Sequence, residues 1–277
     1  MNNIEAAVTE HYGDKGLLAR ILDSLEAASV GRGRLQPEDL APVEEFHIGG
    51  REATQYAVDK LSLVRGQHVL DVGCGIGGAA RYIAAHSGCI VKGIDLTPEY
   101  IEVAKALTEL TDLDGSVSFE VSSALDMPFD NSVFDAAITM HVAMNIPERV
   151  TLYSEIARVL KPGGTLCIFD VMKKGDNDLV YPVPWAQSGE TSCLKTPHEM
   201  CQLLEDAGFD VRETGDRTDF ALDYFRRVLE ISADSRPSLG VHTVMGESAG
   251  EKMNNVVRNI ENGCIAPVQM VAFKRKD

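Results

Sequence analysis

The sequence predicts an α/β fold built on a doubly wound, mostly parallel sheet with helical lid segments. Strand-like apolar runs alternate with helix-like periodicity between residues 68 and 170, which is typical of parallel strands joined by helices. Four glycines within residues 73–78 follow the first strand-like run, and Asp95 ends the second. Because ligands of such sheets bind beyond the carboxyl ends of the strands, these residues mark the expected site.

The core of this fold is expected between residues 65 and 171. Strands are predicted at 68–72, 90–94, 117–121, 134–140 and 164–170, with helices at 77–86, 98–109 and 147–159.

Segments on both sides of the core are expected to supply the lid. Residues 1–64 form a predicted N-terminal helical cap, with helices at 4–12, 16–28 and 49–61 and a Gly- and Pro-rich loop at 31–42. Residues 172–277 are expected to complete the core with a closing strand at 266–274, after a lid insertion at about 172–262. That insertion is predicted to contain a helix at 197–207, a strand start at 208–211 and two or three helices from 218 onward. All three segments are expected to form one compact domain.

Composition and charge restrict the expected functions. The chain has 277 residues, of which 44% are hydrophobic, and a formal net charge of −16. An acidic field of this size repels nucleic acid, so a small-molecule partner is expected instead. The N-terminus lacks a signal-peptide pattern and no apolar run reaches the ~18 residues of a membrane span, so a cytoplasmic location is expected. The six cysteines form no C-x-x-C pair, so neither a metal site nor a disulfide framework is predicted, and assembly into a homo-oligomer is left open.

The turn after the first predicted strand carries the chemistry of the site. Glycine adopts positive φ readily and lets the backbone approach a ligand closely. Asp71 precedes these glycines, and a carboxylate in that place would repel a pyrophosphate but attract an ammonium group. Asp95 can accept hydrogen bonds from both hydroxyls of a ribose. The predicted ligand therefore has a ribose and a positive charge but no phosphates, a description that S-adenosylmethionine fits.

Five ordered segments resemble those of class I S-adenosylmethionine-dependent methyltransferases, whose core is a Rossmann-like sheet. They are residues 71–77, Asp95 with Leu96, residues 123–129, residues 134–141 and residues 160–164. Ser123 stands where the family usually has an aspartate beside the adenine, so the backbone of Ala124 and Leu125 is expected to share that contact. The resemblance implies the following cofactor-binding residues: Tyr12, Phe46, Gly49, Asp71, Gly73, Cys74, Gly75, Gly77, Asp95, Leu96, Ser123, Ala124, Leu125 and Met140.

A second resemblance covers residues 44–54 and 11–13, which are similar to segments of sarcosine and dimethylglycine methyltransferases and related small-molecule enzymes. It implies that Tyr12 and residues 46–51 close over the methionine half of the cofactor. Aromatic rings suit a sulfonium, and Gly49 at a helix start suits a carboxylate. Routine packing of the aromatic rings, and a plain surface charge for Arg51, are the alternatives.

Methyl transfer to a small acceptor proceeds by direct in-line displacement, which needs alignment and a dry pocket. His141 follows the fourth predicted strand and is placed to receive a substrate proton, so we predict that it is catalytic; a structural histidine is the alternative. Tyr12 is the second predicted catalytic residue. The residues expected to bind the substrate are His47, Arg51, Met144, Asn145, Tyr181 and Trp185.

The leading hypothesis is N-methylation of a glycine-type amine, sarcosine or dimethylglycine. An acidic chain and an aromatic wall such as Trp185 suit a growing quaternary cation. S-methylation of a small thiol or thioether stays open, as does C- or O-methylation of a quinone or phenol with His141 as the base. A regulatory module that binds S-adenosylmethionine without catalysis is the remaining alternative.

Overall fold

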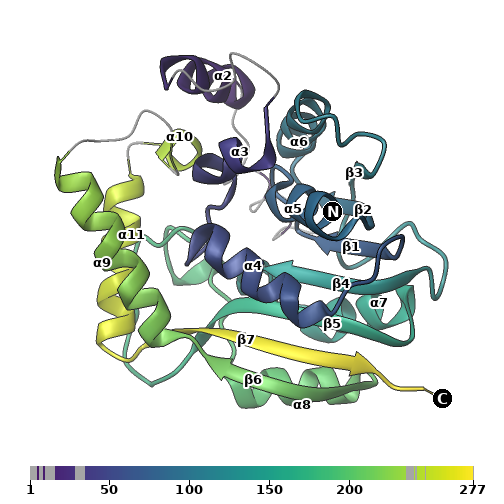
Figure 1. Cartoon of the computed structure of the whole chain (residues 1–277). Helices are drawn as coiled ribbons and strands as arrows, with labels where there is room; N and C mark the ends of the chain where they lie inside the picture. Colours follow the sequence, from purple (N-terminus) through teal and green to yellow (C-terminus); the bar gives the residue numbers. More distant parts are fainter. Residues whose placement is uncertain are drawn as a thin grey trace.

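The computed structural model describes residues 5, 9, 16–28, 35–234, 240, 242–246 and 248–276. This part of the chain is centred on a seven-stranded sheet of order β3-β2-β1-β4-β5-β7-β6 (Figure 1). The strands are β1 (His68–Val72), β2 (Ile90–Asp95), β3 (Val117–Val121), β4 (Phe134–Met140), β5 (Leu160–Lys173), β6 (Phe209–Asp216) and β7 (Ile265–Lys274). β1 to β5 pair in parallel, whereas β7 is antiparallel to both β5 and β6. The predicted doubly wound, mostly parallel sheet is confirmed.

Helices cover both faces of the sheet, because successive residues of a strand point to opposite sides. The covering helices are α4 (Gly50–Leu61), α5 (Gly78–Ser87) and α6 (Pro98–Leu110) on one face, and α7 (Arg149–Val159) and α8 (Pro197–Asp206) on the other (Figure 1). Val69 packs in one apolar cluster with Ala57 of α4. Its neighbour Leu70 packs in a second cluster with Leu152 of α7. The central strands are therefore buried on both faces, and this packing fixes the positions of their ends.

The remaining helices lie beyond the carboxyl ends of the parallel strands. They are α2 (Leu17–Ala27), α3 (Pro37–Glu44), α9 (Thr218–Asp234), α10 (His242–Met245) and α11 (Ala249–Glu261), with single turns η1 (Ala143–Asn145) and η2 (Gly189–Thr191). α9 and α11 lie side by side, and α10 packs against α2 and α3 (Figure 1). Segments from the two ends of the chain thus meet at the site where the sequence predicts a lid.

The loop predicted at 31–42 is wrong from Pro37 onward, where α3 begins. The fixed φ of Pro37 suits the first turn of a helix. The backbone N–H of Gln36 donates to Asp39 Oδ2 at 2.8 Å, which satisfies a donor that the helix start leaves unpaired. Proline therefore marks a helix start here, not a loop.

Two further differences concern element bounds. The strand predicted at 164–170 is longer, because β5 begins at Leu160 directly after α7. Most of the helix predicted at 4–12 lies outside the described residues, and so does Tyr12.

Within the ranges that are described, no helix combines the length and apolar character that crossing a bilayer requires.

Candidate active site

A cavity of about 420 Å³ lies at the carboxyl ends of β1, β2 and β4. The turns after these strands form one side of it. The segment between α3 and α4 and the helices α9 to α11 form the other sides. A ligand in this cavity would therefore contact both the sheet core and the lid.

The glycine turn brings backbone to the cavity surface. Gly73 and Gly75 have φ angles of 73° and 53°. A Cβ on Gly73 would lie 2.4 Å from Val142, and one on Gly75 would lie 3.0 Å from the Phe46 ring. Glycine adopts such positive φ angles without strain, as the sequence predicts, and it leaves room for Val142 and the Phe46 ring.

Asp95 ends β2 with its carboxylate held in place. Its Oδ2 accepts the Gly75 N–H at 3.0 Å, and its Oδ1 accepts the Thr97 N–H at 2.9 Å. Burial raises the pKa of Asp95, and these hydrogen bonds offset part of the rise. Asp95 lines the cavity, so it is an oriented acceptor for ligand hydroxyls.

Asp71 lies deeper, with 2% of its surface exposed, and its Oδ2 has no hydrogen-bond partner among the described residues. Burial above all, then repulsion from Asp95 and Glu45, raises the pKa of Asp71 to about 7. A cation in the cavity would stabilise this carboxylate. The two aspartates together suit a ligand with an ammonium group and a ribose, such as S-adenosylmethionine.

Ser123 has an acidic neighbour that the sequence did not reveal. Its Oγ donates to Glu5 Oε1 at 2.5 Å and accepts the Leu125 N–H at 3.0 Å. Glu5 also lines the cavity. Glu5 thus brings a carboxylate from the N-terminal segment to Ser123, the position where the resemblance led us to expect an aspartate.

His141 follows β4 in the left-handed conformation, with φ 56°. Nδ1 lies 3.1 Å from the Phe169 carbonyl oxygen, which can only accept, so Nδ1 carries the proton. Nε2 then accepts the Ile48 N–H at 3.4 Å. Burial, followed by the charge of His47, lowers the pKa of His141 to about 3. His141 is therefore neutral at physiological pH and joins the strand end to the α3–α4 segment.

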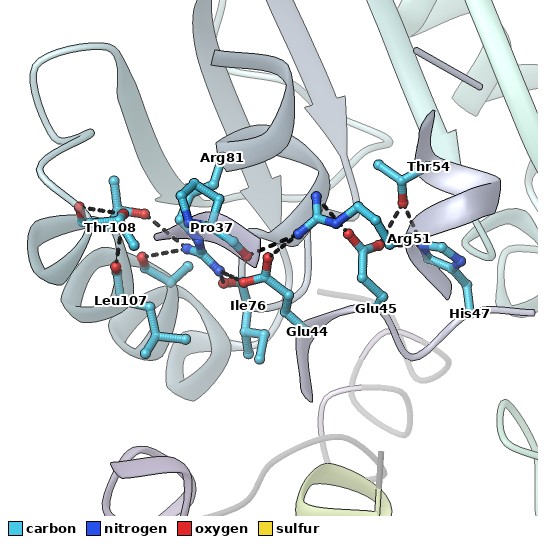
Figure 2. A network of polar contacts seen from close by, with 12 residues as sticks. Pro37, Glu44, Glu45, His47, Arg51, Thr54, Ile76, Arg81, Leu107 and Thr108 are labelled. Atoms are coloured by element: carbon cyan, nitrogen blue, oxygen red, sulfur yellow. Dashed lines mark hydrogen bonds and ion pairs between the residues drawn. The ribbon is translucent and has the colours of Figure 1, made fainter. Parts of the chain in front are cut away.

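His47 stands beside it in a different environment, with ring centroids 5.9 Å apart. His47 Nε2 lies 2.8 Å from Glu45 Oε2 and 3.0 Å from Thr54 Oγ1 (Figure 2). Nδ1 is buried with no hydrogen-bond partner in the described part of the chain. Burial would raise the pKa of Glu45, but the His47 hydrogen bond and the charges of His47 and Arg51 lower it overall. A carboxylate oxygen can only accept, so His47 Nε2 carries a proton and the Glu45 carboxylate orients the ring.

Arg51 does not line the cavity, although the sequence predicts that it binds substrate. It is held behind the cavity wall between Glu44 at 2.9 Å and Glu45 at 3.0 Å (Figure 2). Glu44 also pairs with the fully buried Arg81. Arg51 therefore holds the two glutamates in place, a role that its spacing in the sequence could not reveal.

Three other predicted residues also lie outside the cavity lining. Gly77 caps α5, where a Cβ would lie 2.5 Å from Phe119. Gly49 caps α4 and borders a separate, smaller pocket. Tyr181 packs against the apolar cluster of α9 and α11. Packing explains these three residues without a ligand.

The other predicted residues share a place in the cavity lining. They are Phe46, His47, Asp71, Gly73, Cys74, Gly75, Asp95, Leu96, Ser123, Ala124, Leu125, Met140, His141, Met144, Asn145 and Trp185.

Trp185 and Asn145 hold the lid loop against the core. Asn145 Nδ2 donates to the carbonyl oxygens of Trp185 at 2.7 Å and Thr191 at 3.2 Å. Trp185 Nε1 donates to Ser192 Oγ at 2.9 Å. Both side chains anchor the loop while they line the cavity, so anchoring the loop is compatible with a place for Trp185 in an aromatic wall.

Glu45, Tyr224, Phe225 and Lys252 are among the lining residues that sequence reasoning missed. Glu45 lies next to Phe46, which the sequence did predict as a site residue. An acid two residues before His47 could have indicated a hydrogen bond to that histidine. Lys252 interrupts an otherwise apolar stripe of α11, which was also visible as a pattern.

Comparison with known proteins shows the family. Residues 70–168 match the methyltransferase domain. The chain is 34% identical over 187 residues to O-methyltransferase resE of Aspergillus sclerotiorum, covering 66% of this chain and 69% of that protein. It is 31% identical over 183 residues to methyltransferase GfsG of Streptomyces halstedii, covering 65% of each. It is 35% identical over 219 residues to phosphoethanolamine N-methyltransferase 1 of Triticum aestivum, covering 78% of this chain but 42% of that protein.

Solved structures share the fold. Geranyl diphosphate C-methyltransferase from Streptomyces coelicolor A3(2) aligns with a TM-score of 0.73 at 17% identity, over 99% of this chain and 98% of that one. A Galdieria sulphuraria protein assigned as a sarcosine dimethylglycine methyltransferase aligns with a TM-score of 0.67 at 19% identity, over 81% and 86%.

The sheet and its strand-end cavity define a Rossmann-like α/β enzyme of the methyltransferase type. More specifically, the chain belongs to the class I S-adenosylmethionine-dependent methyltransferases, which use S-adenosylmethionine as cofactor.

Proposed function

We propose that this protein transfers the methyl group of S-adenosylmethionine to the nitrogen of a glycine-type amine, sarcosine or dimethylglycine. The charge of the cavity carries this proposal. Its described lining holds six acidic residues, Glu5, Glu44, Glu45, Asp71, Asp95 and Glu148, against one lysine and no arginine. Such a lining favours cationic ligands, namely the cofactor and a methylated ammonium product.

Aromatic side chains support the same acceptor class. Phe46, Tyr100, Trp185, Tyr224 and Phe225 all line the cavity. Aromatic faces attract sulfonium and quaternary ammonium groups through their quadrupoles, and water is excluded where they pack. The overall charge of −16 further supports a small molecule over nucleic acid.

S-adenosylmethionine, when bound, supplies a methyl carbon to which the acceptor nitrogen bonds as the C–S bond breaks and S-adenosylhomocysteine leaves. Asp95 and the glycine turn would hold the ribose side of the cofactor, and Asp71 would pair with its ammonium group. An amine acceptor must first give up its ammonium proton. We assign that proton to His47, because its ring lines the cavity and its Nε2 is hydrogen-bonded to Glu45, which leaves Nδ1 as the acceptor. His141, neutral and bonded at both nitrogens, would orient the acceptor or its neighbours.

Release of S-adenosylhomocysteine tests the proposal. The panel contains sarcosine, dimethylglycine, a short thiol, a thioether acid and a catechol, each at millimolar concentration with S-adenosylmethionine. Turnover with sarcosine or dimethylglycine, and mass-spectrometric detection of the methylated amine, would support the amine. If S-adenosylhomocysteine binds but neither amine is methylated, the amine proposal fails while the family assignment stands.

A second candidate is O-methylation of a larger apolar molecule that carries a hydroxyl group. The far side of the cavity is apolar, with Met144, Ile146, Met253 and Val257 in its lining. Two fungal relatives with 32% and 34% identity are named as O-methyltransferases. Turnover of the catechol alone in the panel would select this candidate.

A further inference from the structure

α11 carries one charged side chain on a face that otherwise packs into the protein. Ala249, Lys252, Val256 and Ile260 are spaced three or four residues apart and are all buried. Val256 and Ile260 belong to the apolar cluster that joins α9, α11 and the Trp185 loop. Lys252 therefore occupies a place in the helix pattern where an aliphatic residue would be expected.

Lys252 has no ion pair or hydrogen bond with any other residue in the described ranges, although only 7% of its surface is exposed. Burial lowers the pKa of its ammonium group, and no carboxylate in the described part of the chain offsets this effect. Burying an unpaired cation costs free energy, and proteins normally pair such a group. Lys252 lines the cavity, so its partner can come from a ligand.

The rest of the lining makes this lysine exceptional. It is the only lysine or arginine among the described lining residues, while acidic groups gather around the cofactor side of the cavity. The lid-side lining also includes Trp185, Tyr224, Phe225, Met253, Asn254 and Val256, none of which carries a charge. An anion is the ligand group that this place would stabilise most.

We infer that Lys252 binds an acid group of the methyl acceptor, a carboxylate or a phosphate, on the lid side of the cavity. This inference rests on the proposed function, because it requires the acceptor to occupy the cavity. It narrows the acceptor to a molecule with both an amine and an acid group, with the amine toward the carboxylates and aromatic rings. A glycine-type amino acid and a phosphorylated amino alcohol both meet this description.

Matched ligand pairs test the inference and separate the two acids. Dimethylglycine is compared with its methyl ester, and phosphoethanolamine with ethanolamine, so that each pair keeps the amine and loses the anion. Each ligand is titrated into the complex of the protein with S-adenosylhomocysteine. Its binding is followed by the fluorescence of Trp185, the only tryptophan, which lies in the cavity lining. We expect at least one acid to bind at least about 10-fold more tightly than its neutral partner.

Variants of Lys252 identify the residue responsible. Lys252→Met should abolish the preference for the acid, and Lys252→Arg should retain part of it. Lys105→Met removes a comparable helix lysine at an exposed position of α6 and should leave the preference unchanged. S-adenosylhomocysteine affinity and the melting temperature of each variant show whether the fold and the cofactor site are intact.

Three results would overturn the inference: equal binding of acids and neutral partners, a preference that survives Lys252→Met, or no binding of either acid. Failure of the proposed function looks different. If phosphoethanolamine binds through Lys252 while sarcosine and dimethylglycine are not methylated, the glycine-type acceptor is wrong and the role of Lys252 stands.

Discussion

The cavity has two halves that are built in different ways. The cofactor half, where we place S-adenosylmethionine, is made by short turns after strands, with Gly73, Asp95 and Ser123 each at or near its own strand end. The half on the lid side depends on contacts between distant segments, such as Asn145 with Trp185 and Asn259 with Val180. The cofactor half is therefore encoded locally, whereas the lid half is encoded in tertiary packing.

The two histidines at the boundary between these halves give the largest expected effect. His47→Gln should lower the turnover rate by ~10²–10⁴-fold for an amine or hydroxyl acceptor, because the proton loses its acceptor. His141→Gln should have a smaller effect, since the pKa of about 3 keeps His141 neutral. Steady-state turnover with each variant, alongside unchanged S-adenosylhomocysteine affinity, measures both.

The opposite order would contradict the assignment of the proton to His47. A greater loss in His141→Gln would restore the role that the sequence alone predicts for that residue. The shape of the pH–rate profile adds a second criterion, because removal of the true proton acceptor should abolish the acidic limb of the profile.

A variant of Asp71 tests whether this buried carboxylate lowers the stability of the ligand-free protein while it strengthens cofactor binding. Asp71→Asn should raise the unfolding free energy of the ligand-free protein at pH 8 by about 2 kcal/mol, with an upper limit of about 4 kcal/mol. The same variant should bind S-adenosylhomocysteine more weakly, because a neutral amide cannot pair with the ammonium group. Thermal melts with and without S-adenosylhomocysteine measure both effects.

The pH dependence of this effect follows from the raised pKa of about 7. Below about pH 4, Asp71 is protonated in both the folded and unfolded chains and contributes nothing. As the pH rises toward 7, the unfolded chain releases the proton and the folded chain keeps it, so stability falls. The gain in unfolding free energy from Asp71→Asn should therefore be larger at pH 8 than at pH 5. An equal gain at both pH values would show that the pKa of Asp71 is not raised in the folded protein.

The sequence predicted the turns at the strand ends well because their causes are local. The glycines need positive φ within the turn itself, and Asp95 needs only to end its strand. The role of Arg51 could not be predicted, because it depends on Glu44, which also pairs with Arg81, and on packing between α3, α4 and α5 (Figure 2). For the same reason Glu5 beside Ser123 was invisible, since 118 residues separate them.

α3 and Lys252 were missed for a different reason. Both are visible in the sequence, but a proline at a helix start resembles a loop signal and a lone lysine in a helix resembles a surface charge. Only burial distinguishes the alternatives, and burial is decided by how the lid packs on the sheet.

Asp95→Ala is expected to weaken S-adenosylmethionine binding by about 1–3 kcal/mol, because two oriented hydrogen-bond acceptors are lost. Isothermal titration with S-adenosylhomocysteine measures this loss. Asp114→Ala removes an exposed carboxylate outside the cavity and serves as the matched control. Unchanged affinity in Asp95→Ala would remove the basis for placing the ribose at β2, whatever the lid half does.

The smallest expected effect separates the two roles of Trp185. Trp185→Leu removes the aromatic face and should weaken binding of a cationic or amine acceptor by ~0.5–1 kcal/mol. The KM of that acceptor should therefore rise a few-fold. Ser192→Ala removes only the partner of Trp185 Nε1 and keeps the ring. If the ring face binds the acceptor, KM should rise in Trp185→Leu and stay nearly constant in Ser192→Ala, while S-adenosylhomocysteine affinity changes in neither. Equal increases in both variants would show that Trp185 acts by anchoring the loop, and that the lid half recognises the acceptor through its other residues.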